Sequence, residues 1–167
     1  MRIERFRWLA GLIAAQPGRK LVGRTRLQKT VRLLQRVGMP SDYEFRMHHY
    51  GPYSEGVQAD ISLLDRLGLV NEMEEQANQG HTYSVFEAMR SAELPEIDRF
   101  RQVVSLLSEE ETTILELAAT YDMYREKKIP HSLALRFLKS KKGDKCGEGR
   151  RDQALKLLCK LKLPTDE

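Results

Sequence analysis

Short apolar segments with helical spacing, each ended by glycine or proline, constrain the fold of this chain more than any other feature of its sequence. In three of them the apolar residues recur near the 3.6-residue period of a half-buried helix. The spacing predicts helices over 2–16 and 25–37, and a third helix that begins at the cap residue Ser54 and stops at Gly68.

Aromatic residues at 45–50 indicate a short strand, which Gly51-Pro52 is expected to end. Two further strands, around 69–75 and 82–86, are separated by a glycine-containing turn and predict a β-hairpin. The resulting order of helix, helix, strand, helix and hairpin is that of a winged helix-turn-helix domain.

Beyond about residue 90 the pattern is all-helical. Ser108 and Glu111 match a capping box, in which the two side chains bond free backbone N–H groups at a helix start. We expect a charged, glycine-containing loop at 139–149. The predicted helices cover 95–107, a segment from 108 that buries Ile114, Leu117, Ala118 and Tyr121, then 131–138, and 152–163 with Ala154, Leu158 and Leu161 inward.

The predicted fold is therefore mainly α with a small β-hairpin, an α+β class. We expect a winged helix-turn-helix-like domain at 1–90 and a C-terminal helical region at 91–167 packed on it.

The charged residues are unevenly distributed along the 167 residues of the chain. The net formal charge is +4, but residues 1–36 sum to +9, residues 37–124 to −12, residues 125–162 to +9 and the last five to −2. A basic–acidic–basic layout of this kind is a reason to look for polyanionic partners.

Several classes of protein are not expected. No apolar run approaches the ~20 residues needed to span a bilayer, so we expect no membrane association. Cys146 and Cys159 lack disulfide-framework or metal-finger spacing, which favours free thiols in a reducing compartment and a cytoplasmic protein. The histidines lack zinc-site spacing, and no nucleophile elbow or phosphate-binding glycine loop occurs. We therefore expect no metal, no cofactor, no catalytic residue and no enzyme activity.

Basic residues on the predicted second helix are the main nucleic-acid signal. At 100° per residue, three of its cations gather within about 60° of one another, on a different side from the apolar residues. We predict an outer basic stripe that contacts phosphates together with the basic C-terminal loop, whereas a merely solvated surface is the alternative. The candidate contact residues are Arg24, Arg26, Lys29, Arg32, Arg36, Lys141 and Lys142.

The predicted third helix argues against ordinary docking of a winged domain, in which that helix enters the major groove. Its charged residues sum to −2, and the predicted hairpin adds Glu72, Glu74 and Glu75. Because carboxylates facing phosphates are repulsive, we expect any DNA to be bound by the basic N- and C-terminal helices instead.

A series of motifs follows in order over residues 20–70: Arg24-Thr25-Arg26-Leu27-Gln28-Lys29, Tyr43-Glu44-Phe45, Tyr50-Gly51-Pro52-Tyr53-Ser54 and Ile61-Ser62-Leu63-Leu64-Asp65. In this order they resemble the YwgA-like family of largely uncharacterised prokaryotic proteins. More distantly, the chain is similar to the SocA-like (Panacea) antitoxin domain. That second resemblance implies action by direct binding of a toxin, and neither resemblance implies catalytic residues.

The Tyr-Gly-Pro-Tyr-Ser turn admits two interpretations. Gly51 permits unusual backbone angles, Pro52 fixes φ and Ser54 can cap a helix, which is sufficient for a structural role. Tyr50 and Tyr53, where exposed, are candidates for anchoring a protein partner, because tyrosine is favoured at interfaces.

These observations predict a non-catalytic regulatory protein with a winged-helix-like core that binds DNA through its basic N- and C-terminal helices. The alternative is an antitoxin-like or adaptor protein that binds another protein directly. A toxin, a regulatory protein or a second copy of the chain are the protein partners left open.

Overall fold

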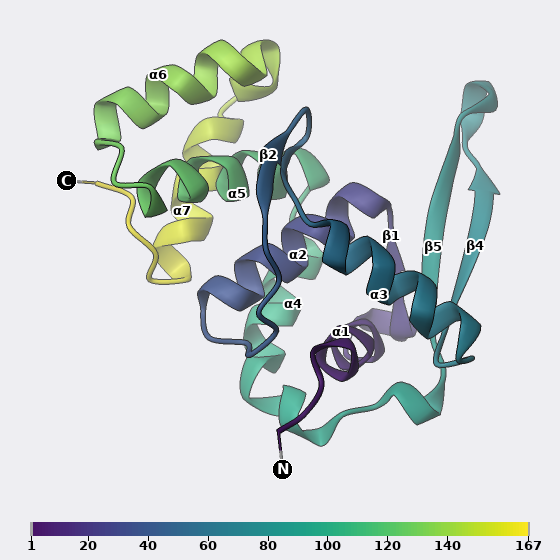
Figure 1. Cartoon of the computed structure of the whole chain (residues 1–167). Helices are drawn as coiled ribbons and strands as arrows, with labels where there is room; N and C mark the ends of the chain where they lie inside the picture. The colour runs from purple at the N-terminus through teal and green to yellow at the C-terminus, as the bar shows by residue number, and fades with distance from the viewer. Residues whose placement is uncertain (1, 167) are drawn as a thin grey trace.

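The computed structural model describes residues 2–166 and shows a mixed α+β fold (Figure 1). Helical segments make up 61% of the chain and strands 14%, with seven α-helices and two small sheets among the described residues. The predicted mainly α class with a small amount of β structure is confirmed at this level.

The three helices predicted in the first half are present. They are α1 (Arg5–Ala14), α2 (Arg24–Arg36) and α3 (Glu55–Arg66). Ser54 caps α3 as predicted, because its hydroxyl accepts a hydrogen bond from the Val57 amide at 3.3 Å.

A three-stranded antiparallel sheet lies beside these helices. The predicted hairpin is formed by β4 (Val70–Gln76) and β5 (Thr82–Ala88), and its tip projects away from the body of the molecule (Figure 1). β5 also pairs with β1 (Lys20–Val22), giving the strand order β1-β5-β4. Strand β1 was missed by the sequence analysis, since three residues are too few to show alternation.

The strand predicted at 45–50 is present at 46–48, but it ends at His48 and not at Gly51-Pro52. Gly51 and Pro52 instead begin β3 (Gly51–Tyr53), which pairs with β2 (Arg46–His48) in a second, two-stranded sheet. Pro52 is tolerated because one side of each strand in a two-stranded ribbon is unpaired, and a missing N–H on that side breaks no ladder bond. The turn between the strands is His49-Tyr50, and Gly51 follows it with φ of +88°.

The predicted helix 95–107 is divided. A 3₁₀ segment (Pro95–Phe100) leads into α4 (Arg101–Glu109). The capping box is also wrong, because α5 (Thr112–Glu126) has Glu111 at its cap position and the Ser108 hydroxyl donates to the Ser105 carbonyl at 2.7 Å within α4. The predicted buried residues of this region are all buried: Ile114, Leu117, Ala118 and Tyr121.

The last part of the chain is more helical than predicted. Helix α6 (His131–Lys142) continues through much of the expected loop and is followed by a 3₁₀ segment (Gly143–Cys146) and α7 (Arg150–Lys160). The loop prediction for 139–149 is therefore wrong over 139–142, which belong to α6. The inward residues predicted for the last helix are correct: Ala154, Leu158 and Leu161 are buried.

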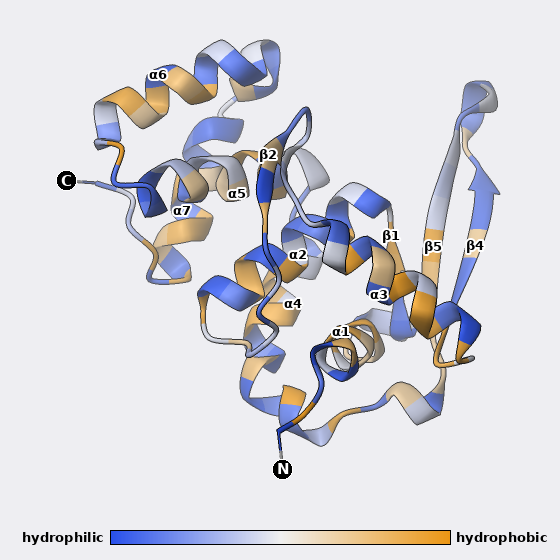
Figure 2. Cartoon of the chain, viewed as in Figure 1, coloured by the Kyte–Doolittle hydropathy of each residue, from blue (hydrophilic) through white to orange (hydrophobic). Residues whose placement is uncertain are grey.

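Helix α5 lies at the centre of the fold and contacts α2, α6, α7 and β3. Residues 114–123 are buried on all sides of the helix. One hydrophobic cluster includes residues before and after position 90, for example Leu34 of α2 and Leu117 of α5. In Figure 2, orange apolar residues alternate with blue hydrophilic ones along the helices of both halves. The two halves thus share a core, and the boundary at residue 90 stays a prediction.

Candidate functional site

The cations predicted to form an outer stripe on α2 are largely buried. Lys29 is 1% exposed and Arg32 is 4% exposed. The prediction that this stripe faces solvent is therefore wrong. The helical wheel correctly separated the basic side from the apolar side, but α5 and the β2–β3 hairpin both pack on α2. At this depth neither residue is placed on the outer surface, where the phosphate backbone of a DNA duplex would lie.

Arg24 and Arg26, the first two basic residues of α2, make hydrogen bonds within the fold. The Arg24 guanidinium donates to Glu72 at 2.5 Å and to the Ser84 hydroxyl at 3.2 Å, and so attaches α2 to the sheet. The Arg26 guanidinium donates to the carbonyls of Leu107 and Glu110 at 3.1 and 2.5 Å. Arg26 therefore satisfies carbonyls at the C-terminus of α4, which helical geometry leaves without partners.

Arg32 and Arg36 form an ion cluster with two acidic residues of α5. Asp122 is fully buried, and the Arg36 guanidinium donates to it at 2.7 and 3.3 Å. Arg32 reaches Asp122 at 3.3 Å and also pairs with Glu126. Burial alone would lower the pKa of Arg36, but the hydrogen bond and the charges of Asp122 and Glu126 outweigh it and raise the pKa. The cluster links α2 to α5 and is structural.

The Tyr-Gly-Pro-Tyr-Ser turn is attached to α2 through Gln28. The Gln28 side-chain amide accepts a hydrogen bond from the Ser54 backbone N–H at 2.9 Å and donates one to the Ser54 carbonyl at 3.0 Å. It thus pairs with both backbone groups of Ser54, as a residue of a neighbouring β-strand does. The Lys29 ammonium donates to the Pro52 carbonyl at 2.7 Å. These contacts give the Leu-Gln-Lys motif of α2 a structural role. Tyr53 is half-buried, whereas Tyr50 is 60% exposed.

A second buried ion cluster lies beneath this turn. Glu116 of α5 accepts from Lys142 at 2.6 Å and from Lys145 at 3.0 Å. Lys142 also donates to the His49 carbonyl at 2.9 Å. Burial lowers the pKa of Lys142 against the opposing effect of Glu116. Lys142 is therefore buried within the fold, contrary to its predicted role in an exposed basic loop, whereas Lys141 is exposed as expected.

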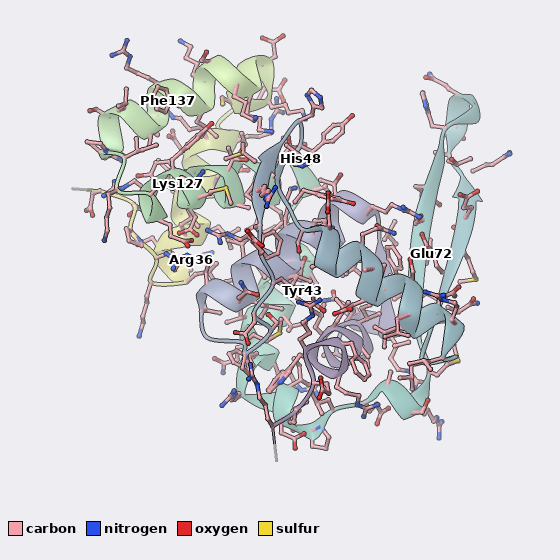
Figure 3. All side chains as sticks on the ribbon, in the orientation of Figure 1. Arg36, Tyr43, His48, Glu72, Lys127 and Phe137 are labelled. Carbon is pink, nitrogen blue, oxygen red and sulfur yellow. The ribbon has the colours of Figure 1, made fainter. Side chains whose placement is uncertain are left out.

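A cavity of about 390 Å³ opens between α2, the β2–β3 turn and α3. Its walls combine cationic, amide and aromatic side chains from segments far apart in the sequence. Figure 3 shows His48 on the hairpin above α2. The lining residues are Arg24, Thr25, Gln28, Lys29, His48, His49, Tyr50, Gly51, Tyr53 and Gln58.

The largest group of cations without ion pairs lies in the C-terminal half. Within residues 2–166, eight exposed lysines and arginines after position 125 take part in no salt bridge. Phe137, which is 40% exposed, lies among them on α6 at the outer edge of the molecule (Figure 3). The eight cations are Lys127, Lys128, Arg136, Lys139, Lys141, Lys156, Lys160 and Lys162.

The acidic residues of α5 that oppose the cations of α2 were not predicted from the sequence; they are Glu116, Asp122 and Glu126. A signal for the first two was present, because each interrupts an otherwise apolar part of α5. A charged residue flanked by buried positions indicates a buried partner of opposite sign.

Among residues 2–166 no group of three or more histidine, cysteine, aspartate or glutamate side chains is placed to hold a metal ion. None of the described helices is long and apolar enough to cross a membrane. His131 is hydrogen-bonded to Tyr121, with Nδ1 of the imidazole 2.7 Å from the tyrosine hydroxyl.

Fold and site together define a mixed α+β protein with a basic C-terminal surface, in which one buried ion cluster joins α2 to the central helix α5 and a second joins α5 to the end of α6. No protein-family model matches the chain. Over 57 residues the chain is 33% identical to the protein named "Uncharacterized protein YwgA" of Bacillus subtilis (strain 168), covering 34% of each protein. The match thus spans about a third of the length of that curated relative. The likeness is consistent with the YwgA-like resemblance, and the resemblance to the antitoxin domain stays a prediction.

Proposed function

We propose that the chain is a non-catalytic regulatory protein that binds duplex DNA through its C-terminal helices. The binding surface, called here the α6–α7 surface, consists of Arg136, Phe137, Lys139 and Lys141 of α6 with Lys156 and Lys160 of α7. One observation carries the proposal. These cations have no acidic partner within the described residues, whereas six of the ten cations before residue 37 are in salt bridges.

The composition of α6 supports a polyanionic partner. No acidic residue occurs in His131–Lys142, so no charge on the helix itself opposes phosphate binding. At 100° per residue, Arg136 and Lys139 lie on the side away from the buried Ala134 and Leu138. Phe137 lies about 100° around the helix from Arg136, and its partly exposed ring packs edge-on against Tyr124 of α5. Cations neutralise phosphates, and an exposed aromatic ring can pack on sugar or base.

The N-terminal part supports a winged-helix-like core with an unusual docking mode. The order α1, β1, α2, α3, β4 and β5, with the sheet order β1-β5-β4, is the arrangement we propose to be winged-helix-like. Its hairpin exposes Glu74 and Glu75, which would repel phosphates. In Figure 1 this hairpin and α6 lie on opposite sides of the molecule, so DNA on α6 avoids those carboxylates.

The test is a titration of the protein against a fluorescein-labelled duplex, followed by anisotropy at several salt concentrations. We expect log Kd to rise linearly with log salt concentration, with a slope of roughly 0.9 for each phosphate contacted. The triple variant R136A/K139A/K141A is expected to weaken binding and to lower this slope by about 2 to 3, because Arg136 and Lys139 share one side of α6 and Lys141 lies on another.

A charge-matched variant serves as the control. R46A/R66A/R90A removes three exposed cations outside the α6–α7 surface and lowers the net charge equally. We expect it to retain most of the salt slope. Equal losses in the two triple variants would indicate non-specific attraction, and an absence of binding at low salt would refute the proposal.

Direct protein binding is the second candidate, favoured by the exposure of Tyr50 at the tip of the β2–β3 turn. A second copy of the chain is the simplest such partner. Sedimentation of the wild type and of Tyr50→Ser tests this candidate, since self-association through the turn would be lost in the variant while DNA binding would be unchanged.

A further inference from the structure

The cavity beside the β2–β3 turn has the composition of a ligand site. At about 390 Å³ it is at the lower end of the volumes typical of small-molecule pockets. α2 supplies Arg24, Thr25, Gln28 and Lys29 to one wall, and the turn supplies His48, His49 and Tyr50 to another. The lining side chains thus include aromatic rings and several hydrogen-bond donors, and no carboxylate is among them, although Arg24 is paired with Glu72.

Positive charge is in excess behind this wall. Lys29, Lys142 and Lys145 surround Glu116, the one carboxylate that the cluster contains. Lys29 is 1% exposed, and its ammonium makes one hydrogen bond, to the Pro52 carbonyl. Lys145 is partly exposed, so the buried charges are those of Lys29, Lys142 and Glu116 and sum to +1. Because buried charges are normally balanced, this excess favours an additional anion.

The N-terminus of α2 also favours an anion in the cavity. Gly23 provides no side-chain cap, and the first turn of the helix contains no acidic residue. Arg24 and Thr25, which begin the helix, line the cavity. Free backbone N–H groups and the helix dipole favour an anion at such a place, here reinforced by the buried Lys29.

The aromatic residues indicate the shape of the ligand. The rings of His48 and Tyr53 lie 4.9 Å apart between centroids and are tilted by 36°. Tyr50 flanks the entrance, with the Lys145 ammonium 5.1 Å from the centre of its ring. Flat, polarisable walls next to cations suit a planar ring that carries a negative group.

We propose that this cavity binds a small planar organic anion, an aromatic ring system bearing one carboxylate or phosphate group. The anionic group is placed near Lys29 and the start of α2, and the ring lies against His48, Tyr50 and Tyr53. The proposal does not depend on DNA binding by the α6–α7 surface.

The protonation of Lys29 gives the site a pH dependence. Burial lowers the pKa of Lys29 to about 8, partly opposed by Glu116 of α5 and reinforced by Lys142 of α6 and Lys145 of the following 3₁₀ segment. The other charged or titratable groups at the cavity are Arg24, His48, His49, Tyr50 and Tyr53. We expect anion affinity to fall as the pH rises through 8, when Lys29 loses its charge.

Isothermal titration calorimetry with four probes tests the proposal: benzoate, adenosine monophosphate, adenosine and inorganic phosphate. We expect benzoate or the nucleotide to bind with Kd of about 1 mM or below, and at least about tenfold more tightly than adenosine or inorganic phosphate. Binding by benzoate points to an aromatic acid, and binding by the nucleotide alone points to a nucleotide ligand.

Two histidine variants provide a matched pair that leaves the core intact. His48→Ala removes an exposed residue of the cavity wall, and His81→Ala removes an exposed residue of the β4–β5 turn. We expect at least about a threefold loss of affinity in the first and no change in the second. Lys29→Met, verified as folded by circular dichroism, is expected to lose about tenfold. The proposal would be overturned if neither benzoate nor adenosine monophosphate bound, or if His48→Ala, His81→Ala and Lys29→Met all bound the ligand equally well.

Discussion

Replacing Gly51 by alanine tests how the β2–β3 turn is seated on the central helix. Gly51 has φ of +88°, a conformation that costs an alanine roughly 1–2 kcal/mol. An added Cβ would also lie 2.5 Å from the Thr120 hydroxyl oxygen. That oxygen cannot easily move, because Thr120 is fully buried and donates to the Glu116 carbonyl at 2.7 Å. Overpacking of this kind adds about 1–3 kcal/mol.

We therefore expect Gly51→Ala to lower the free energy of unfolding by about 2–5 kcal/mol. Urea denaturation measures this loss, with circular dichroism reporting on the helices and the single tryptophan, Trp8, reporting on α1. For an m-value of about 2 kcal/mol/M the midpoint falls by roughly 1–2.5 M.

A matched glycine separates the two contributions. Gly80 has φ of +80°, and an added Cβ there would meet no atom within 4 Å. Gly80→Ala is thus expected to show the backbone cost alone, about 1–2 kcal/mol. The double variant G51A/T120A removes the clashing hydroxyl and should recover about 1–3 kcal/mol as a coupling energy. Equal losses at the two glycines and zero coupling would refute the docking of the turn on α5.

Two further predictions concern the buried ion clusters. Asp122→Asn leaves Arg32 without its buried partner and is expected to lower the free energy of unfolding by about 3–5 kcal/mol. Glu126 is half-exposed, so Glu126→Gln is expected to cost less than about 1 kcal/mol. Urea denaturation measures both losses. Burial lowers the pKa of Lys29 from 10.5 to about 8. Between pH 8 and pH 10.5 the folded protein therefore binds fewer protons at Lys29 than the unfolded chain does, so the free energy of unfolding rises with pH across that window. Compared with Lys29→Met, the wild type should gain about 1–3 kcal/mol between pH 7 and pH 10, and a difference that stays constant or falls would contradict the assignment.

Local signals were sufficient to predict the elements whose ends are determined locally. The Ser54 cap and Gly68, which follows the last turn, define the ends of α3, and both signals lie in the sequence next to the helix itself. The Ser108 capping box failed because a distant residue intervenes: Arg26 bonds the carbonyls of Leu107 and Glu110 and so completes the end of α4. A tertiary contact more than 80 residues away in sequence leaves no local pattern.

The candidate site was predicted less well than the fold. Helical periodicity placed Lys29 and Arg32 on one side of α2, but periodicity states which residues share a face and not what packs on that face. The choice between solvent and burial depended on α5, whose Glu116 and Asp122 oppose them. The cavity was not predicted, because it is assembled from α2, the turn and α3.

The basic–acidic–basic layout of the sequence is explained largely by pairing inside the fold. The basic first block meets the acidic middle block in ion pairs such as Arg5–Asp60, Arg24–Glu72 and Arg36–Asp122. Folding therefore neutralises much of the first block. The last block has few acidic partners beyond Glu116, and most of its cations remain exposed. If the layout serves a polyanion, its contacts belong on α6 and α7, so removing the cations of α6 should alter DNA binding more than removing any exposed cation of the first block.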